Sequence, residues 1–234
     1  MNAKEHPSRP VYVNFSAFKA KESFFLLSDG VRKAIVEEAG RFLDVQDAPE
    51  VPSDGVVTRG VYLTTGFRAD VDVMIWWIAP TPEAIQRGLR DFRRTELGRR
   101  LDVKWSFMGL ARPAEFHHDH IPAFLQGKPA RRHICVYPFT RTHEWYLLPG
   151  EERRNLLTAH GKLAEGYEDI LTNTTQSFGL GDDEWLLAFE AERMDRIVDM
   201  IRKLRQAEAR RYTCRETPFI SGVRMSVGEI VDSL

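Results

Sequence analysis

Cysteine is scarce in this chain, and long apolar runs are absent. The two cysteines, Cys135 and Cys214, form no CxxC motif. A disulfide framework and a thiolate zinc site are therefore not expected, and buried free thiols are the better interpretation. The longest apolar run, VMIWWIAP, is too short to span a membrane, and the first residues, MNAKEHPSRP, lack the apolar segment of a signal peptide. We expect a cytoplasmic protein without a membrane span.

An excess of charge of either sign is also missing. The 33 lysines and arginines nearly balance the 34 aspartates and glutamates, and the formal net charge is −1. Without a global positive field, a general nucleic-acid binder is not expected. The 234 residues are enough for one large domain or two small fused ones.

Apolar periodicity predicts the same series of elements twice, strand, helix, two strands, helix, strand. The first series comprises strands at 11–18, 56–65, 70–78 and 104–109. Its first helix is predicted at 29–46 with Ser28 as the N-cap, and its second helix begins at Thr81-Pro82. The second comprises strands at 133–140, 170–178, 184–190 and within 215–225, with helices at 151–167 and 194–211. This order is that of two ferredoxin-like βαββαβ units. It predicts an α+β fold in which the two units form a dimeric α+β barrel, with halves at 1–110 and 133–234 and a connecting segment at 111–132.

The helix predicted at 151–167 contains a histidine on its apolar face. Leu156, Leu157, Leu163, Ala164 and Tyr167 form a stripe with a period close to 3.6 residues, and His160 lies within it. An imidazole in that position needs a partner, which is a backbone carbonyl, a second side chain or a metal.

Other candidate groups lie near this helix. Tyr137 has a structural interpretation, as an aromatic residue at the end of a strand, and a functional one, as a phenol that loses a proton or a hydrogen atom. Arg141 and Trp145 are either ordinary loop residues or a pair that binds a carboxylate through guanidinium and indole N–H donors. The run His117-His118-Asp119-His120 resembles a metal-ligand sequence, but without helical context or cysteines a solvated loop is favoured. One of its histidines could still act as a general base.

Long motifs in the second half resemble a known family. The segment YPFTRTHEWYLLPGEERRNLLTAHG, with SFGLGDDEWLLAFE and FISGVRMSVGEI, is similar to the chlorite dismutase-like superfamily, and more closely to its coproheme decarboxylases. The resemblance covers nearly the whole chain. It implies a homopentamer in which the second halves carry the porphyrin.

The resemblance also implies roles for individual residues. It implies a proximal iron ligand, a catalytic tyrosine, a distal histidine that acts as the base for peroxide, and groups that contact the porphyrin propionates. The iron ligand is His160 and the catalytic tyrosine is Tyr137. The distal histidine is His120, with His118 as the second choice. The groups that contact the propionates are Arg141, Trp145 and Arg205.

The implied reaction is the hydrogen-peroxide-dependent decarboxylation of iron-coproporphyrin III (coproheme) to haem b, through a monovinyl tripropionate intermediate. It is the last step of coproporphyrin-dependent haem biosynthesis. A transient contact with ferrochelatase is a further expectation, and the sequence leaves the delivery partner open. Chlorite dismutases carry a distal arginine about thirteen residues after the proximal histidine, and the stretch Leu171 to Thr174 has none. The alternatives are a chlorite dismutase-like or peroxidase haem enzyme, a non-catalytic haem-binding protein and an interaction module without a ligand.

Overall fold

The computed structural model describes residues 9–113, 115–116 and 121–234. Its strands are β1 (Val11–Ala20), β2 (Val57–Leu63), β3 (Val73–Ala79), β4 (Leu101–Ala111), β5 (His133–Arg141), β6 (Leu171–Gln176), β7 (Trp185–Ala191), β8 (Thr213–Arg215) and β9 (Ile220–Met225). Its α-helices are α1 (Glu22–Phe25), α2 (Asp29–Leu43), α3 (Pro82–Phe92), α4 (His143–Leu147), α5 (Gly150–Leu163), α6 (Met194–Leu204) and α7 (Val227–Ser233). Short 3₁₀ helices are η1 (Gly98–Arg100), η2 (Ala123–Gln126) and η3 (Glu208–Tyr212).

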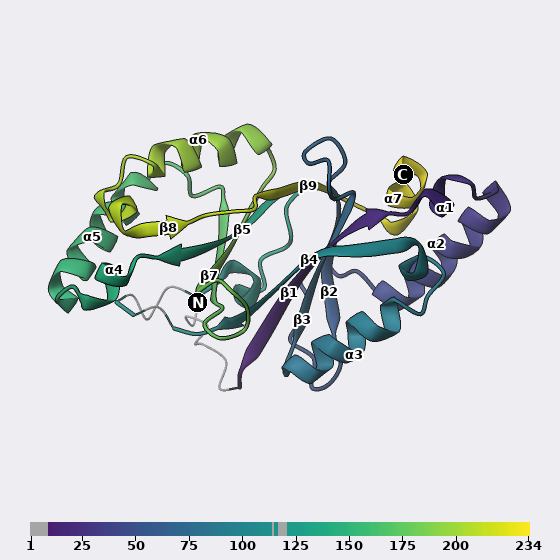
Figure 1. Ribbon diagram of the computed structural model, residues 1–234, viewed down its shortest axis with the longest axis horizontal. Coiled ribbons are helices and arrows are strands. Elements are labelled where there is room, and N and C mark those ends of the chain that lie inside the picture. The colour runs from purple at the N-terminus through teal and green to yellow at the C-terminus, as the bar shows by residue number, and fades with distance from the viewer. Residues whose placement is uncertain (1–8, 114, 117–120) are drawn as a thin grey trace.

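The strands of the described residues pair antiparallel in one continuous order. That order is β7-β6-β4-β1-β3-β2-β9-β5-β8, and a further pairing of β7 with β5 closes eight of the strands into a ring. Helices α1, α2, α3 and α7 lie at one end of the molecule, and α4, α5 and α6 lie at the other (Figure 1). The predicted α+β class is confirmed.

The two halves meet where β4 approaches β6 and where β2 pairs with β9. A glycine stands at each join. A Cβ at Gly109 of β4 would lie 2.1 Å from Thr175 Oγ1 of β6, and a Cβ at Gly222 of β9 would lie 2.9 Å from the carbonyl oxygen of Leu63. Both joins therefore need a residue without a side chain, because protein interiors leave no space for the extra atom.

Strand β3 explains the longest apolar run of the sequence. All seven of its residues are buried. Met74 and Trp76 point into the ring, whereas Ile75 and Trp77 pack under the helices of the first half. A strand that is covered on both faces reads as a continuous apolar segment. None of the helices among the described residues is long and apolar enough to cross a membrane.

Several predicted details are wrong. The predicted helix 194–211 ends at Leu204, and the separate 3₁₀ helix η3 follows it. Val198, an apolar residue of α6, is 57% exposed. The final helix α7, which packs against α2, was not predicted. Cys135 is a buried free thiol as expected, whereas Cys214 is exposed.

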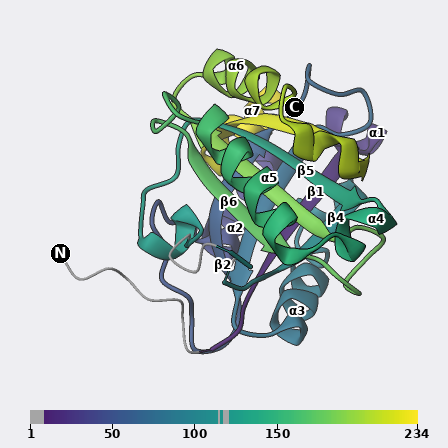
Figure 2. The same cartoon turned by 90° about the vertical axis from the view of Figure 1, so that its left-hand side faces the viewer.

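The helix that carries the candidate histidine differs most from expectation. α5 ends at Leu163 and has no buried residue, so its apolar stripe is at best half-buried. It packs mainly against η3 and α6 rather than directly on the sheet. Figure 2, which views the molecule from this end, shows α5 in front of the strands.

Candidate functional site

The site is built on one face of β5. Side chains alternate along a strand, so Tyr137, Phe139 and Arg141 point to the same side. Strand β7 pairs antiparallel with β5 and adds Leu187, directly opposite Tyr137, and Phe189. The strand continues to Arg141, one residue beyond its predicted end at position 140, so Tyr137 lies within the strand rather than at its end.

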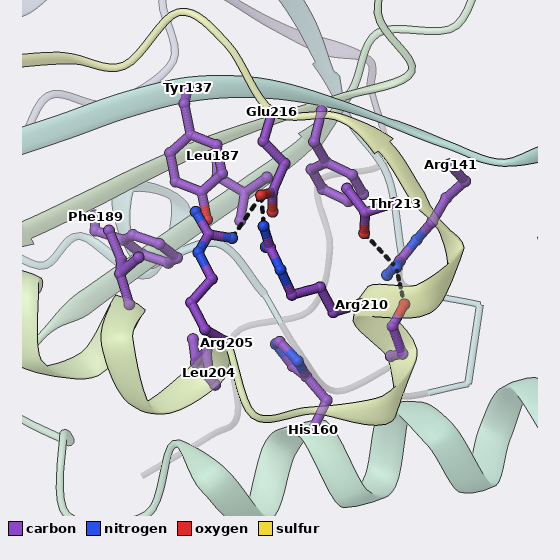
Figure 3. A pocket seen from close by; sticks show the side chains of 13 residues that line it. Tyr137, Arg141, His160, Leu187, Phe189, Leu204, Arg205, Arg210, Thr213 and Glu216 are labelled. Atoms are coloured by element: carbon purple, nitrogen blue, oxygen red, sulfur yellow. Dashed lines mark hydrogen bonds and ion pairs between the residues drawn. The ribbon is translucent and has the colours of Figure 1, made fainter.

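These strands form the floor of a cavity of about 90 Å³ beneath α5 (Figure 3). The end of α6, η3 and β8 close its sides. The remaining lining residues are His160, Ile201, Leu204, Arg205, Ala209, Arg210, Thr213 and Glu216. Among the residues that the structure describes, those that line the cavity all lie from position 137 to position 216, in the second half of the chain.

Tyr137 is held between aromatic rings in the floor. It is 6% exposed, and its ring stacks on that of Phe219 with centroids 4.3 Å apart. Burial raises the pKa of Tyr137, and the nearby Cys135 and Glu216 raise it further, against the opposing effect of two arginines. The phenol therefore keeps its proton at neutral pH.

His160 enters the cavity from α5, on the side opposite the strands (Figure 3). Burial lowers the pKa of His160, Arg141 lowers it further, and Glu216 acts in the opposite sense. The imidazole is therefore neutral at pH 7, which is the form that binds a metal.

Arg141 is fixed by neutral groups. Its Nη1 donates hydrogen bonds to the carbonyl oxygen of Ala209 at 3.0 Å and to Thr213 Oγ1 at 3.3 Å. Its guanidinium lies 4.3 Å from the centroid of a Trp145 ring. Burial lowers the pKa of Arg141 from its ordinary value, but an arginine remains charged in proteins.

Trp145 belongs to α4, whereas the sequence predicted a loop. Its ring is buried between Arg141 and Tyr212, and it does not line the cavity. Its predicted contact with a propionate stays a prediction, and its observed contact is to Arg141.

A carboxylate bridges two further arginines. Arg205 Nη1 and Arg210 Nη1 donate to the same oxygen of Glu216, Oε2, at 2.5 and 2.7 Å. Arg205 was among the predicted residues, but Arg210, Thr213 and Glu216 were missed. The charged stretch from Arg210 to Glu216, which leads into an apolar strand, is the signal that could have found them.

Comparisons with known proteins agree with this architecture. The chlorite dismutase family model matches residues 32–225. The chain belongs to the chlorite dismutase family. It is 52% identical over 204 residues to a coproheme decarboxylase of Mycolicibacterium smegmatis, covering 87% of this chain and 86% of the relative. A coproheme decarboxylase of Staphylococcus saprophyticus is 27% identical and matches over 66% of this chain and 67% of its own length.

A solved structure from the family supports the fold. A mutant chlorite dismutase from Candidatus Nitrospira defluvii superposes with a TM-score of 0.83 at 24% identity, covering 97% of this chain and 96% of that one. The family position expected to carry a distal arginine falls in β6. There the buried Asn173 accepts a hydrogen bond from the backbone N–H of Phe124, which belongs to the connecting segment. His118 and His120 lie outside the described residues.

Proposed function

We propose that this chain decarboxylates coproheme to haem b with hydrogen peroxide. The observation that carries the proposal is the 52% identity to a coproheme decarboxylase across 87% of the chain. The cavity supports it, because a tyrosine, a neutral histidine and three arginines converge there. Each of two propionates becomes a vinyl group and releases CO₂, and its two electrons reduce one hydrogen peroxide to water.

The residues present fit an iron porphyrin better than a bare metal ion. Among the described residues there is no group of three or more His, Cys, Asp or Glu side chains that could hold a metal ion. A lone histidine instead suits a metal whose other ligands come from a macrocycle. The cavity of about 90 Å³ is below the roughly 300–1,000 Å³ of small-molecule sites, so side chains must move to admit the ligand.

In this proposal, bound coproheme would supply the redox centre for the oxidation by hydrogen peroxide. His160, which enters the cavity from α5, would hold the iron through its neutral ring. Tyr137 gives up the hydrogen of its Oη as an electron and a proton together, because its raised pKa disfavours loss of the proton alone. The resulting tyrosyl oxygen would then take a hydrogen atom from the propionate β-carbon. Loss of a second electron to the redox centre and of CO₂ would leave the vinyl group.

The arginines position the propionates. Arg141, Arg205 and Arg210 present guanidinium groups to the cavity, and a guanidinium binds a carboxylate through paired donors. Holding the reacting carbon close to Tyr137 is a problem of positioning.

Tyr137→Phe tests the function. Coproheme is added to the protein and then titrated with peroxide, and the porphyrin is analysed by mass spectrometry. We expect Tyr137→Phe to bind coproheme and to form no vinyl product. Tyr167→Phe, which removes a hydroxyl outside the cavity, is the matched control and should turn over. Full conversion by Tyr137→Phe would refute the role of the tyrosine, and failure of the unaltered protein to bind coproheme would refute the function.

We also propose that His120 accepts the proton of peroxide, as the family resemblance implies. His120→Ala should slow the reaction with peroxide and leave coproheme binding largely intact. His118→Ala is the control, because the two histidines are close in sequence. If His118→Ala alone slows the reaction, the roles of the two histidines are exchanged.

A homopentamer, which the family resemblance implies, and a transient contact with ferrochelatase complete the proposal. Light scattering coupled to size-exclusion chromatography gives the number of subunits directly. Transfer of coproheme from loaded ferrochelatase is expected to be faster than release of coproheme into solution. Equal rates would argue against direct contact.

A further inference from the structure

Glu216 lies in the cavity where a ligand carboxylate would be expected. Among the described residues that line the cavity it is the one acid, and it faces three arginines. Its carboxylate is 18% exposed and holds Arg205 and Arg210 through one oxygen (Figure 3). Arg141 has neutral partners, so Glu216 is the group that balances the charge of this wall.

The two ion pairs occupy N–H donors that a propionate of the ligand would use. Arg205 and Arg210 line the cavity from α6 and η3, and Glu216 draws both guanidinium groups to one point. A propionate that binds either arginine must compete with this carboxylate for the same N–H donors. Two carboxylates at one guanidinium cluster also repel one another.

We propose that Glu216 is a substitute carboxylate, which holds Arg205 and Arg210 until a propionate of the ligand displaces it. This inference rests on the proposed function and adds a determinant of affinity. Glu216 therefore lowers the affinity of the cavity for anions in general. A ligand binds only if its carboxylates and its apolar surface together compensate for displacing Glu216 from the two arginines.

The exchange predicts a characteristic dependence on salt. In the unaltered protein one set of ion pairs replaces another, so the affinity should vary weakly with ionic strength. In Glu216→Gln the arginines have no carboxylate to release, so binding forms new ion pairs. Since salt screens such pairs, affinity of the variant should fall more steeply with ionic strength.

The experiment is a titration with metal-free coproporphyrin III, followed by quenching of tryptophan fluorescence at several salt concentrations. We expect Glu216→Gln to bind about tenfold more tightly than the unaltered protein at low salt. Asp183→Asn is the matched control, because its carboxylate is 16% exposed and pairs with Arg215 at 2.8 Å outside the cavity lining. It should leave the affinity unchanged.

Equal or weaker binding by Glu216→Gln overturns the inference. So does a structure of the loaded protein in which Glu216 still contacts both arginines. If Glu216→Gln does not fold, Glu216→Asp keeps the charge but cannot reach both guanidinium groups, and it should also bind more tightly. Unchanged binding by Glu216→Asp would then refute the idea. Failure of the unaltered protein to bind coproheme, tested in parallel, would refute the proposed function instead.

Discussion

A fully buried ion pair fastens the two halves of the chain together inside the ring of strands. Arg59 of β2 and Glu190 of β7 are both 0% exposed. Arg59 donates to Glu190 Oε1 from Nε at 3.2 Å and from Nη2 at 2.9 Å. Glu190 also accepts from Asn173 Nδ2 and from the backbone N–H of Arg131, and Arg59 Nη2 donates to the carbonyl oxygen of Lys128. The pair therefore joins β2, β6, β7 and the connecting segment.

Removal of Arg59 should lower the free energy of unfolding strongly, because Arg59 is the one cation that pairs with Glu190 among the described residues. Arg59→Met keeps two N–H donors to the carboxylate but strips away its charge partner. Breaking a buried pair in this way costs about 3–5 kcal/mol, a large share of a typical stability of about 5–15 kcal/mol. The double variant Arg59→Met/Glu190→Leu removes the stranded charge. It should recover part of the loss and keep a deficit of about 1–3 kcal/mol, because Asn173 and the Arg131 N–H lose their acceptor.

Urea unfolding followed by tryptophan fluorescence measures these differences, and Trp76 beside the Arg59 guanidinium provides a local reporter. Arg90→Met is the control, since Arg90 is 55% exposed and pairs with the neighbouring Asp91. It should change the free energy of unfolding by less than about 1 kcal/mol. The reasoning fails if Arg59→Met costs no more than Arg90→Met, or if the double variant is no more stable than the single one.

Two further predictions follow from the site and from the join between the halves. Because the pKa of His160 is lowered from 6.5, the folded protein disfavours its charged form, so its contribution to stability is present above pH 6.5 and is lost as pH falls through the lower folded pKa. His160→Gln should flatten the pH dependence of the free energy of unfolding in this range, and an unchanged profile would contradict the lowered pKa. Gly109→Ala places a methyl group 2.1 Å from Thr175 Oγ1 and should destabilise the protein by about 1–3 kcal/mol in urea unfolding. Gly150→Ala, at the start of α5 with no atom within 4 Å of the new Cβ, should be nearly neutral, and a similar loss in both variants would contradict the close-contact argument.

Most of the elements were predictable because local signals agree with burial. Strand β3 alternates between two covered faces, and Thr81 caps α3 by accepting a hydrogen bond from the Ala84 N–H at 3.2 Å. The closure of the ring was not predictable at the level of residues. It depends on strands far apart in sequence, and a glycine such as Gly109 shows its purpose only when Thr175 lies against it.

The site was predictable in part. Alternation along β5 places Tyr137 and Arg141 on one face, and the family resemblance adds His160. Arg210 and Glu216 follow no period, because they come from η3 and from the chain after β8, where spacing carries no information about direction. Their meeting with Arg205 depends on how these segments turn back over the sheet.

The helix α5 shows why sequence alone misjudged the surroundings of His160. Its apolar stripe predicts a buried helix, because leucines at a 3.6-residue period normally face a protein core. In the structure the stripe is half-buried, and the cavity separates His160 from the floor formed by β5 and β7. A helix that covers a ligand carries the same apolar pattern as one that covers a core, since both exclude water from one face. The pattern therefore identifies which face of the helix is turned inward, but it does not distinguish a protein core from a bound molecule as the partner of that face.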